Sequence, residues 1–175
     1  IYRIRYNVYV EECGFERIED HPNGYETDEY EPYSIHFAAL NVNRDVIGTI
    51  RLVLHSDKGF PIEHAVRKLD FVGERPEPNR IAEISRLALI RGYRRRREDG
   101  LYGVKSYLPK SEGGVLPYDD TDSEGYHRRK RPIIVFGFYR AIYHASKKMG
   151  LTHWYLIIEK ELYDSFEVFG FLLHQ

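Results

Sequence analysis

The chain has a single cysteine among its 175 residues, and this scarcity excludes an internal disulfide. A protein without disulfides is typical of a reducing compartment, so we expect a cytoplasmic location. No run of about 18 apolar residues is present, so the sequence predicts no membrane-spanning helix. The formal net charge of -1 gives no overall preference for nucleic acid.

Several motifs that identify enzyme classes are also missing. The sequence contains no phosphate-binding P-loop, no glycine fingerprint for a dinucleotide and no cysteine–histidine spacing for zinc. We therefore expect no metal site and no permanently bound cofactor. Cys13 lies in no nucleophile motif, so a covalent acyl-enzyme intermediate on this residue is disfavoured.

The spacing of apolar residues indicates an α/β fold. It predicts strands and helices in the order strand, hairpin, strand, strand, helix, strand, helix, which favours a mixed central sheet flanked by helices. We expect a single domain over residues 1–175, with a polar segment at about 92–131 and a short helical turn near 62–69. The predicted strands are 34–42, 46–54, 81–90 and 154–158, and the predicted helices are 133–149 and 161–169.

The first 13 residues fit two patterns. Ile4 and Val8 have helical spacing, and Gly14 would end such a helix. Alternation favours a strand slightly, because apolar side chains also recur at every second position from residue 2 to residue 10. Residues 16–31 contain seven acidic residues and a His-Pro-Asn-Gly turn, so they predict a loop.

Charged residues interrupt two of the strands predicted to be buried. Arg51 lies in the run VIGTIRLVL, and Glu83 and Arg86 lie in the run IAEISRLALI. A buried charge is unfavourable unless it is paired, so these residues form a structural ion-pair cluster or line a site. Strand alternation places Glu83 and Ser85 on one face and Arg86 on the other, unless a bulge intervenes.

A cluster of arginines follows the third predicted strand. Arg91, Arg94, Arg95, Arg96 and Arg97 surround a Gly-Tyr pair. Arginine binds phosphate in a bidentate manner, so the cluster suits a phosphate-rich or acidic partner. The alternative is a solvated turn, which is the usual role of a run of charges.

Five segments taken in order carry a family resemblance. They are RYNVY at residues 5–9, Phe15, ETDEYE at 26–31, GTIRL at 48–52 and EISR at 83–86. Together they resemble the acyl-homoserine-lactone (autoinducer) synthases. The chain resembles still more closely the N-acyl amino acid synthases and, most closely, the PEP-CTERM/exosortase system-associated acyltransferases, through EISRLA with its arginine cluster and the later GLTHWYLIIEK.

The resemblance implies a GNAT-like fold in which residues 1–13 form a helix, against the alternation. It implies an N-acyltransferase that takes an acyl group from an acyl carrier protein or coenzyme A thioester and transfers it to an amine. Glu83 would receive a proton from the amine, with Ser85 beside it as a catalytic residue. The resemblance assigns substrate binding or a site network to Arg5, Tyr9, Phe15, Asp28, Glu31, Arg51 and Arg86.

Three departures from the family pattern bear on the acceptor. Tyr9 replaces the usual phenylalanine, Phe15 the usual tryptophan, and Glu31 a second aspartate. These changes favour an amine other than S-adenosylmethionine, such as an amino acid. We also expect Arg86 to meet Asp28 or Glu31 on the face opposite Glu83, because an unpaired Arg86 would be unfavourable.

Two alternatives stay open. One is an autoinducer synthase that uses S-adenosylmethionine. The other is a non-catalytic module that binds nucleic acid through two arginine clusters, at residues 91–97 and 128–131. Against the second, acidic residues lie between the clusters, and aromatic residues do not interleave with them as a stacking platform requires. If the protein is an N-acyltransferase or an autoinducer synthase, we expect the arginines at 91 and 94–97 to hold the phosphates of the acyl donor or its carrier.

Overall fold

The computed structural model describes residues 1–66, 74–93 and 131–158. Contacts divide the chain into two compact units, Ile1–Ile90 with Phe138–Ile157, and Arg91–Gly137 with Ile158–Gln175. The predicted helix at 161–169, most of the polar segment and Arg94–Arg97 lie outside the described residues. The single domain over 1–175 therefore stays a prediction.

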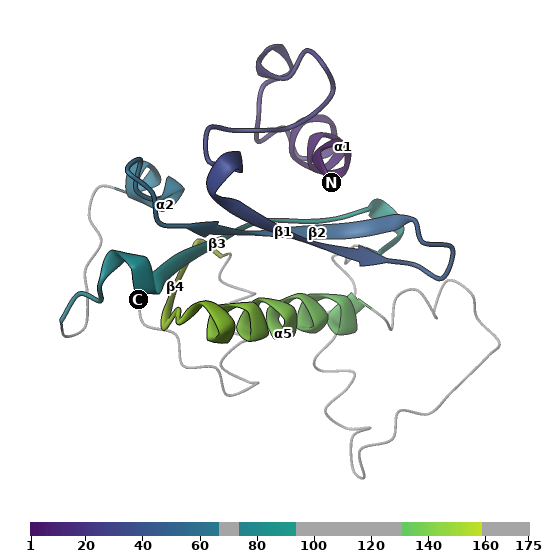
Figure 1. The fold of residues 1–175 in the computed structure, drawn as a ribbon. Helices are drawn as coiled ribbons and strands as arrows, with labels where there is room; N and C mark the ends of the chain where they lie inside the picture. The colour runs from purple at the N-terminus through teal and green to yellow at the C-terminus, as the bar shows by residue number, and fades with distance from the viewer. Residues whose placement is uncertain (67–73, 94–130, 159–175) are drawn as a thin grey trace, which may run out of the picture. The chain divides into compact units, whose positions relative to one another are not determined.

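The first unit is built on a four-stranded mixed sheet, shown in Figure 1. Its strands lie side by side in chain order, and the first three are antiparallel while the last is parallel to the third. All four predicted strands are confirmed. They are β1 (Ser34–Leu40), β2 (Val46–Leu54), β3 (Ile81–Leu89) and β4 (His153–Leu156).

Helices cover both faces of this sheet. α1 (Tyr2–Arg5) and the π-helix η1 (Tyr6–Glu12) lie over one face, and the part of α5 (Arg131–Met149) from Phe138 onward lies over the other (Figure 1). Ile50, Leu52 and Val53 of β2 are fully buried between these layers. This double coverage explains why β2 reads as a nearly continuous apolar run.

The N-terminal segment is helical, so the strand favoured by alternation is wrong and the helix implied by the resemblance is correct. Tyr6, Val8 and Val10 are all buried, which produces the misleading alternation. In a helix with i→i+5 bonds these three side chains point in different directions. The helix is therefore packed against its surroundings on more than one side. The helix ends before Gly14, whose φ of 63° suits glycine.

Short elements connect the layers. Residues 16–31 are mainly a loop, as predicted, with η2 (Ile18–Asp20) inside it and η3 (Glu31–Tyr33) beginning at its last residue. α2 (Pro61–Ala65) and η4 (Pro78–Arg80) flank a gap in the described residues, and η5 (Arg91–Tyr93) follows β3. No helix within 1–66, 74–93 or 131–158 is long and apolar enough to cross a membrane.

Gly48 is the point at which β2 leaves no room for a side chain. A Cβ there would collide with the Leu89 side chain and lie 3.2 Å from the Ala88 carbonyl oxygen. We expect Gly48→Ala to lower the free energy of unfolding by about 1–3 kcal/mol, because overpacking forces neighbouring groups to move. Urea unfolding measures this change.

Gly137 of α5 provides the matched control. A Cβ at this helical position meets nothing within 4 Å. Gly137→Ala should raise the free energy of unfolding by about 0.5–1 kcal/mol, because alanine favours a helix over glycine. Equal effects of the two substitutions would contradict the close approach at Gly48.

Candidate functional site

β3 contains an extra residue near the middle of the sheet. Thr49 of β2 pairs with Ala88 and Arg51 pairs with Ser85, so two steps along β2 correspond to three along β3. This is a β-bulge, which bends a strand and redirects its side chains. Arg86 stands in the bulge with a φ of 54°, a left-handed conformation that few residues other than glycine adopt.

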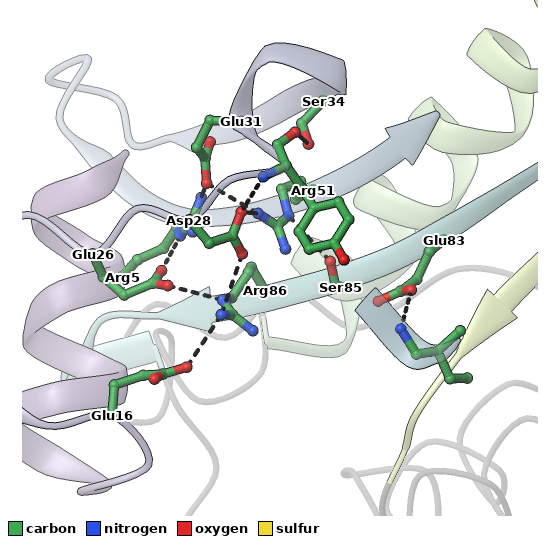
Figure 2. A network of polar contacts seen from close by, with 12 residues as sticks. Arg5, Glu16, Glu26, Asp28, Glu31, Ser34, Arg51, Glu83, Ser85 and Arg86 are labelled. Carbon is green, nitrogen blue, oxygen red and sulfur yellow. Dashed lines mark hydrogen bonds and ion pairs between the residues drawn. The ribbon is translucent and has the colours of Figure 1, made fainter. Parts of the chain in front are cut away.

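Arg51 lies at the centre of the polar network drawn in Figure 2. It is fully buried, and its Nη1 lies 2.7 Å from Asp28 Oδ1 and 3.0 Å from Glu31 Oε1. Its Nε donates a hydrogen bond of 3.2 Å to Ser85 Oγ, the residue opposite it in the sheet. Two acidic residues and a serine thus hold this buried cation in one position.

Arg5 brings a second guanidinium from α1 to the same face of the sheet. It is fully buried, its Nε pairs with the Glu26 carboxylate, and its Nη1 lies 2.7 Å from Glu31 Oε1. Glu31 therefore bridges Arg5 and Arg51, and its other oxygen lies 2.9 Å from His36 Nε2. The acidic loop is fixed in this way to both the helix and the sheet.

Arg86 supplies the third guanidinium. Its Nε donates to Glu26 at 3.1 Å, and its Nη2 donates to Glu16 at 3.1 Å and to Asp28 at 3.4 Å. The predicted contact between Arg86 and Asp28 is present. The guanidinium carbon also lies 5.5 Å from the centre of the Tyr9 ring, within the range of a cation–π contact.

The position of Arg86 corrects one prediction. Arg86 shares Asp28 with Arg51, so its side chain lies on the same face of the sheet as Ser85 rather than on the opposite face (Figure 2). The alternation failed because the extra residue in β3 and the left-handed backbone at Arg86 interrupt the two-residue period.

Charge pairing keeps Glu26 and Asp28 ionised. Burial alone would raise the pKa of Glu26 and of Asp28. Hydrogen bonds from Arg5 and Arg51, with the charge of Arg86, outweigh burial and lower both pKa values below their ordinary range. Three guanidinium groups thus contact four carboxylates, which are Glu16, Glu26, Asp28 and Glu31.

Glu83 behaves differently from these carboxylates. It is 4% exposed, and its Oε2 accepts a hydrogen bond of 2.8 Å from the backbone N–H of Ile62. Burial raises its pKa to about 7, although the Ile62 hydrogen bond and the charge of Arg51 act to lower it. Figure 2 shows Glu83 apart from the three arginines, with its dashed contact going to a backbone nitrogen.

The model of the acetyltransferase (GNAT) domain matches residues 4–102. The chain belongs to this family. The match confirms the predicted fold class and the prediction that the chain carries an acyltransferase domain, while the PEP-CTERM/exosortase association stays a prediction.

Solved structures similar to this chain include BjaI and TofI. One is BjaI, a CoA-dependent acyl-homoserine lactone synthase, with SAM and isopentyl-CoA, at 26% identity over 63% of this chain and 52% of that chain, with a TM-score of 0.39. Another is TofI in a ternary complex with an inhibitor and MTA, at 22% identity over 50% and 47%, with a TM-score of 0.37. The chain spans about half the length of these structures. A comparison with curated proteins gave no match.

The GNAT domain brings together most of the residues that the sequence indicated. Phe15, predicted to bind substrate, is 70% exposed, and its ring centre lies 6.1 Å from that of Tyr9. Arg91 lies in the second unit, so the predicted donor-binding cluster stays a prediction. The remaining indicated residues that contribute to the site are Arg5, Tyr9, Asp28, Glu31, Arg51, Glu83, Ser85 and Arg86.

Sequence reasoning missed three participants. Glu26 opens the segment that carried the resemblance, yet it was not singled out, although it is buried between Arg5 and Arg86. Glu16 lies in the acidic loop, where nothing in the sequence separates it from its exposed neighbours. His36 contacts Glu31, and the strand register pairs it with Arg51, a pairing that follows only once the hairpin is known.

Removing the central cation tests the network. Arg51→Met should lower the free energy of unfolding by about 3–5 kcal/mol, because Asp28 and Glu31 lose a buried partner. Chemical denaturation measures this loss. Lys58→Met, which removes an exposed pair with Glu29, should leave stability nearly unchanged. A stable Arg51→Met protein would show that the network does not support the fold.

The raised pKa of Glu83 predicts an inverse pH dependence. The folded pKa of about 7 exceeds the ordinary value of 4.5, so the folded protein binds the extra proton. The stability that Glu83 contributes is therefore fully present below the unfolded pKa and is lost as pH rises through about 7. Glu83→Gln should raise the melting temperature relative to the unsubstituted protein more at about pH 8.5 than at about pH 5. An equal difference at both values would refute the raised pKa.

Proposed function

We propose that this protein is an N-acyltransferase that moves a fatty acyl group from a carrier-protein or coenzyme A thioester directly to an amine, with an amino acid as the acceptor. The observation that carries the proposal is Glu83, a buried carboxylate on β3 of a GNAT domain. A base with a pKa near 7 accepts a proton at neutral pH more readily than an ordinary glutamate does. The cytoplasmic location also stays a prediction.

The reaction follows from the chemistry of the two substrates. The acceptor arrives as an ammonium ion, and Glu83 receives one of its protons, directly or through a water molecule. The amine nitrogen then attacks the thioester carbonyl, the C–N bond forms, and the C–S bond breaks. The nitrogen loses a second proton as the amide forms, and the leaving thiolate takes up a proton to become the free thiol. No enzyme nucleophile is needed, and Cys13 is exposed.

The open side of β3 supports donor binding at the bulge. β4 pairs with β3 only from Ile81 to Ile84, so within the described residues no strand lies beside β3 from Ser85 to Leu89 on that edge. An extended amide-containing arm binds such an edge through backbone hydrogen bonds. A thioester held there would have its oxyanion near the backbone N–H groups of the bulge.

The carboxylates support an amine acceptor. Four carboxylates against three guanidinium groups leave the network with an excess of negative charge, even without Glu83. Asp28 and Glu16 are its more exposed members, at 23% and 35%. An ammonium group would be attracted to this part of the network. Phe15, exposed beside Tyr9, offers an apolar contact for the rest of the acceptor.

The test offers the purified protein octanoyl-coenzyme A or octanoyl carrier protein, with either a mixture of amino acids or S-adenosylmethionine. Released thiol gives the rate, and mass spectrometry identifies the product. An N-acyl amino acid would support the proposal, and an acyl lactone would favour the autoinducer-synthase alternative. If neither donor loses its acyl group, the proposed function is contradicted.

The same assay tests the base. Glu83→Gln should lower kcat by about a hundred- to ten-thousand-fold, as loss of general acid–base help usually does. In the unsubstituted enzyme, kcat should rise with pH through a single ionisation near the pKa of about 7. Glu29→Gln, at an exposed carboxylate, is the control and should leave kcat unchanged. An active Glu83→Gln enzyme at every pH would exclude Glu83 as the base.

A further inference from the structure

Tyr9 contacts both residues of the β3 bulge from the helix above it. Its hydroxyl donates a hydrogen bond of 2.9 Å to the carbonyl oxygen of Leu87. The Arg86 guanidinium carbon lies 5.5 Å from the centre of its ring. Arg86 and Leu87 are the residues by which β3 exceeds β2 at this point, since only Ile50 lies opposite them. One side chain therefore contacts the two residues whose backbone leaves the regular ladder.

The bulge needs external support. A residue other than glycine with a φ near +54°, as at Arg86, is disfavoured by about 1–3 kcal/mol and persists only where its surroundings hold it. Three carboxylates hold the guanidinium at the end of the Arg86 side chain. The hydrogen bond from Tyr9 to Leu87 fixes the next peptide group directly.

Tyr9 is itself held in place. Its backbone carbonyl accepts hydrogen bonds from the N–H groups of Phe15 at 2.8 Å and of Glu16 at 3.3 Å. The Glu16 carboxylate in turn pairs with Arg86 at 3.1 Å. The helix, the loop that follows it and the bulge are therefore linked to one another. Burial raises the pKa of the Tyr9 phenol to about 12, so its hydroxyl stays protonated and able to donate at any working pH.

We propose that Tyr9 is a positioning residue for acyl transfer, which fixes the β3 bulge through the Leu87 carbonyl so that the donor thioester docks in a reactive orientation. This inference rests on the proposed function, because the bulge matters to catalysis only if the thioester binds there. The hydroxyl is the essential feature. A phenylalanine would keep an aromatic ring under Arg86 but would lose the donor to Leu87.

The experiment compares Tyr9→Phe with Tyr6→Phe. Tyr6 lies in the same helix with a buried ring, and no hydrogen bond from its hydroxyl is found within the part of the chain that the structure describes. Both variants remove one phenol oxygen, so they control for each other. Hydrogen–deuterium exchange followed by mass spectrometry reports on the backbone of β3, and steady-state kinetics with octanoyl-coenzyme A report on catalysis.

We expect Tyr9→Phe to speed amide exchange in the β3 peptide that contains the bulge. We also expect kcat/KM for octanoyl-coenzyme A to fall by about ten- to a hundredfold, because small displacements of a reacting group are costly. The KM of the acceptor and the apparent pKa of the pH profile should stay the same, since Glu83 is untouched. Tyr6→Phe should match the unsubstituted protein in exchange and in kinetics.

Each other outcome counts against the proposal. Unchanged exchange in Tyr9→Phe overturns it whatever the kinetics show, and faster exchange with unchanged kcat/KM also overturns it. A shifted pH profile would mean that Tyr9 acts through Glu83 rather than through the bulge. If the unsubstituted protein releases no thiol from octanoyl-coenzyme A or octanoyl carrier protein, the proposed function itself fails, and the catalytic role of Tyr9 fails with it.

Discussion

Asp28 joins two arginines that the strands alone would leave unpaired. One of its oxygens pairs with Arg51 of β2 and the other with Arg86 of β3. Buried guanidinium groups are strongly unfavourable without partners, so the acidic loop must return over the sheet to supply them. This requirement explains why residues 26–31 follow a fixed path although they form little regular structure. The N-terminal helix is bound into the same arrangement through Arg5 and Glu26.

The same pairing decides the protonation state of Glu83. Each arginine of the network already contacts two or more carboxylates. Within the described residues, Glu83 forms no ion pair and accepts its hydrogen bond from the Ile62 backbone. Burial therefore dominates its pKa and raises it, whereas pairing dominates for Glu26 and Asp28 and lowers theirs. The network thus separates Glu83, a carboxylate able to exchange a proton, from Glu26 and Asp28, which remain charged.

Much of this arrangement could be predicted from the sequence, and the exceptions have physical causes. Apolar runs placed β2 and β3 correctly, because both strands are buried on two faces. Arg51 and Glu83 were recognisable because a charge inside such a run demands an explanation. The bulge left no such sign, since Arg86 is neither a glycine nor a usual left-handed residue. It is set by tertiary contacts, and so is the role of Glu16, whose partner Arg86 lies in a segment distant in sequence.

Two irregular backbone segments meet at the site, and their irregularity is connected. The π-helix η1 supplies Tyr9, and the bulge in β3 supplies Arg86 and the Leu87 carbonyl that Tyr9 contacts. A regular β3 would place the side chain after Ser85 on the opposite face, away from Asp28 and Glu26. Arg86 reaches these carboxylates only because the strand is bulged, and the bulge persists because they and Tyr9 hold it. Ion pairing and strand distortion therefore stabilise each other, and the distortion lies where β3 has passed beyond its pairing with β4, which ends at Ile84.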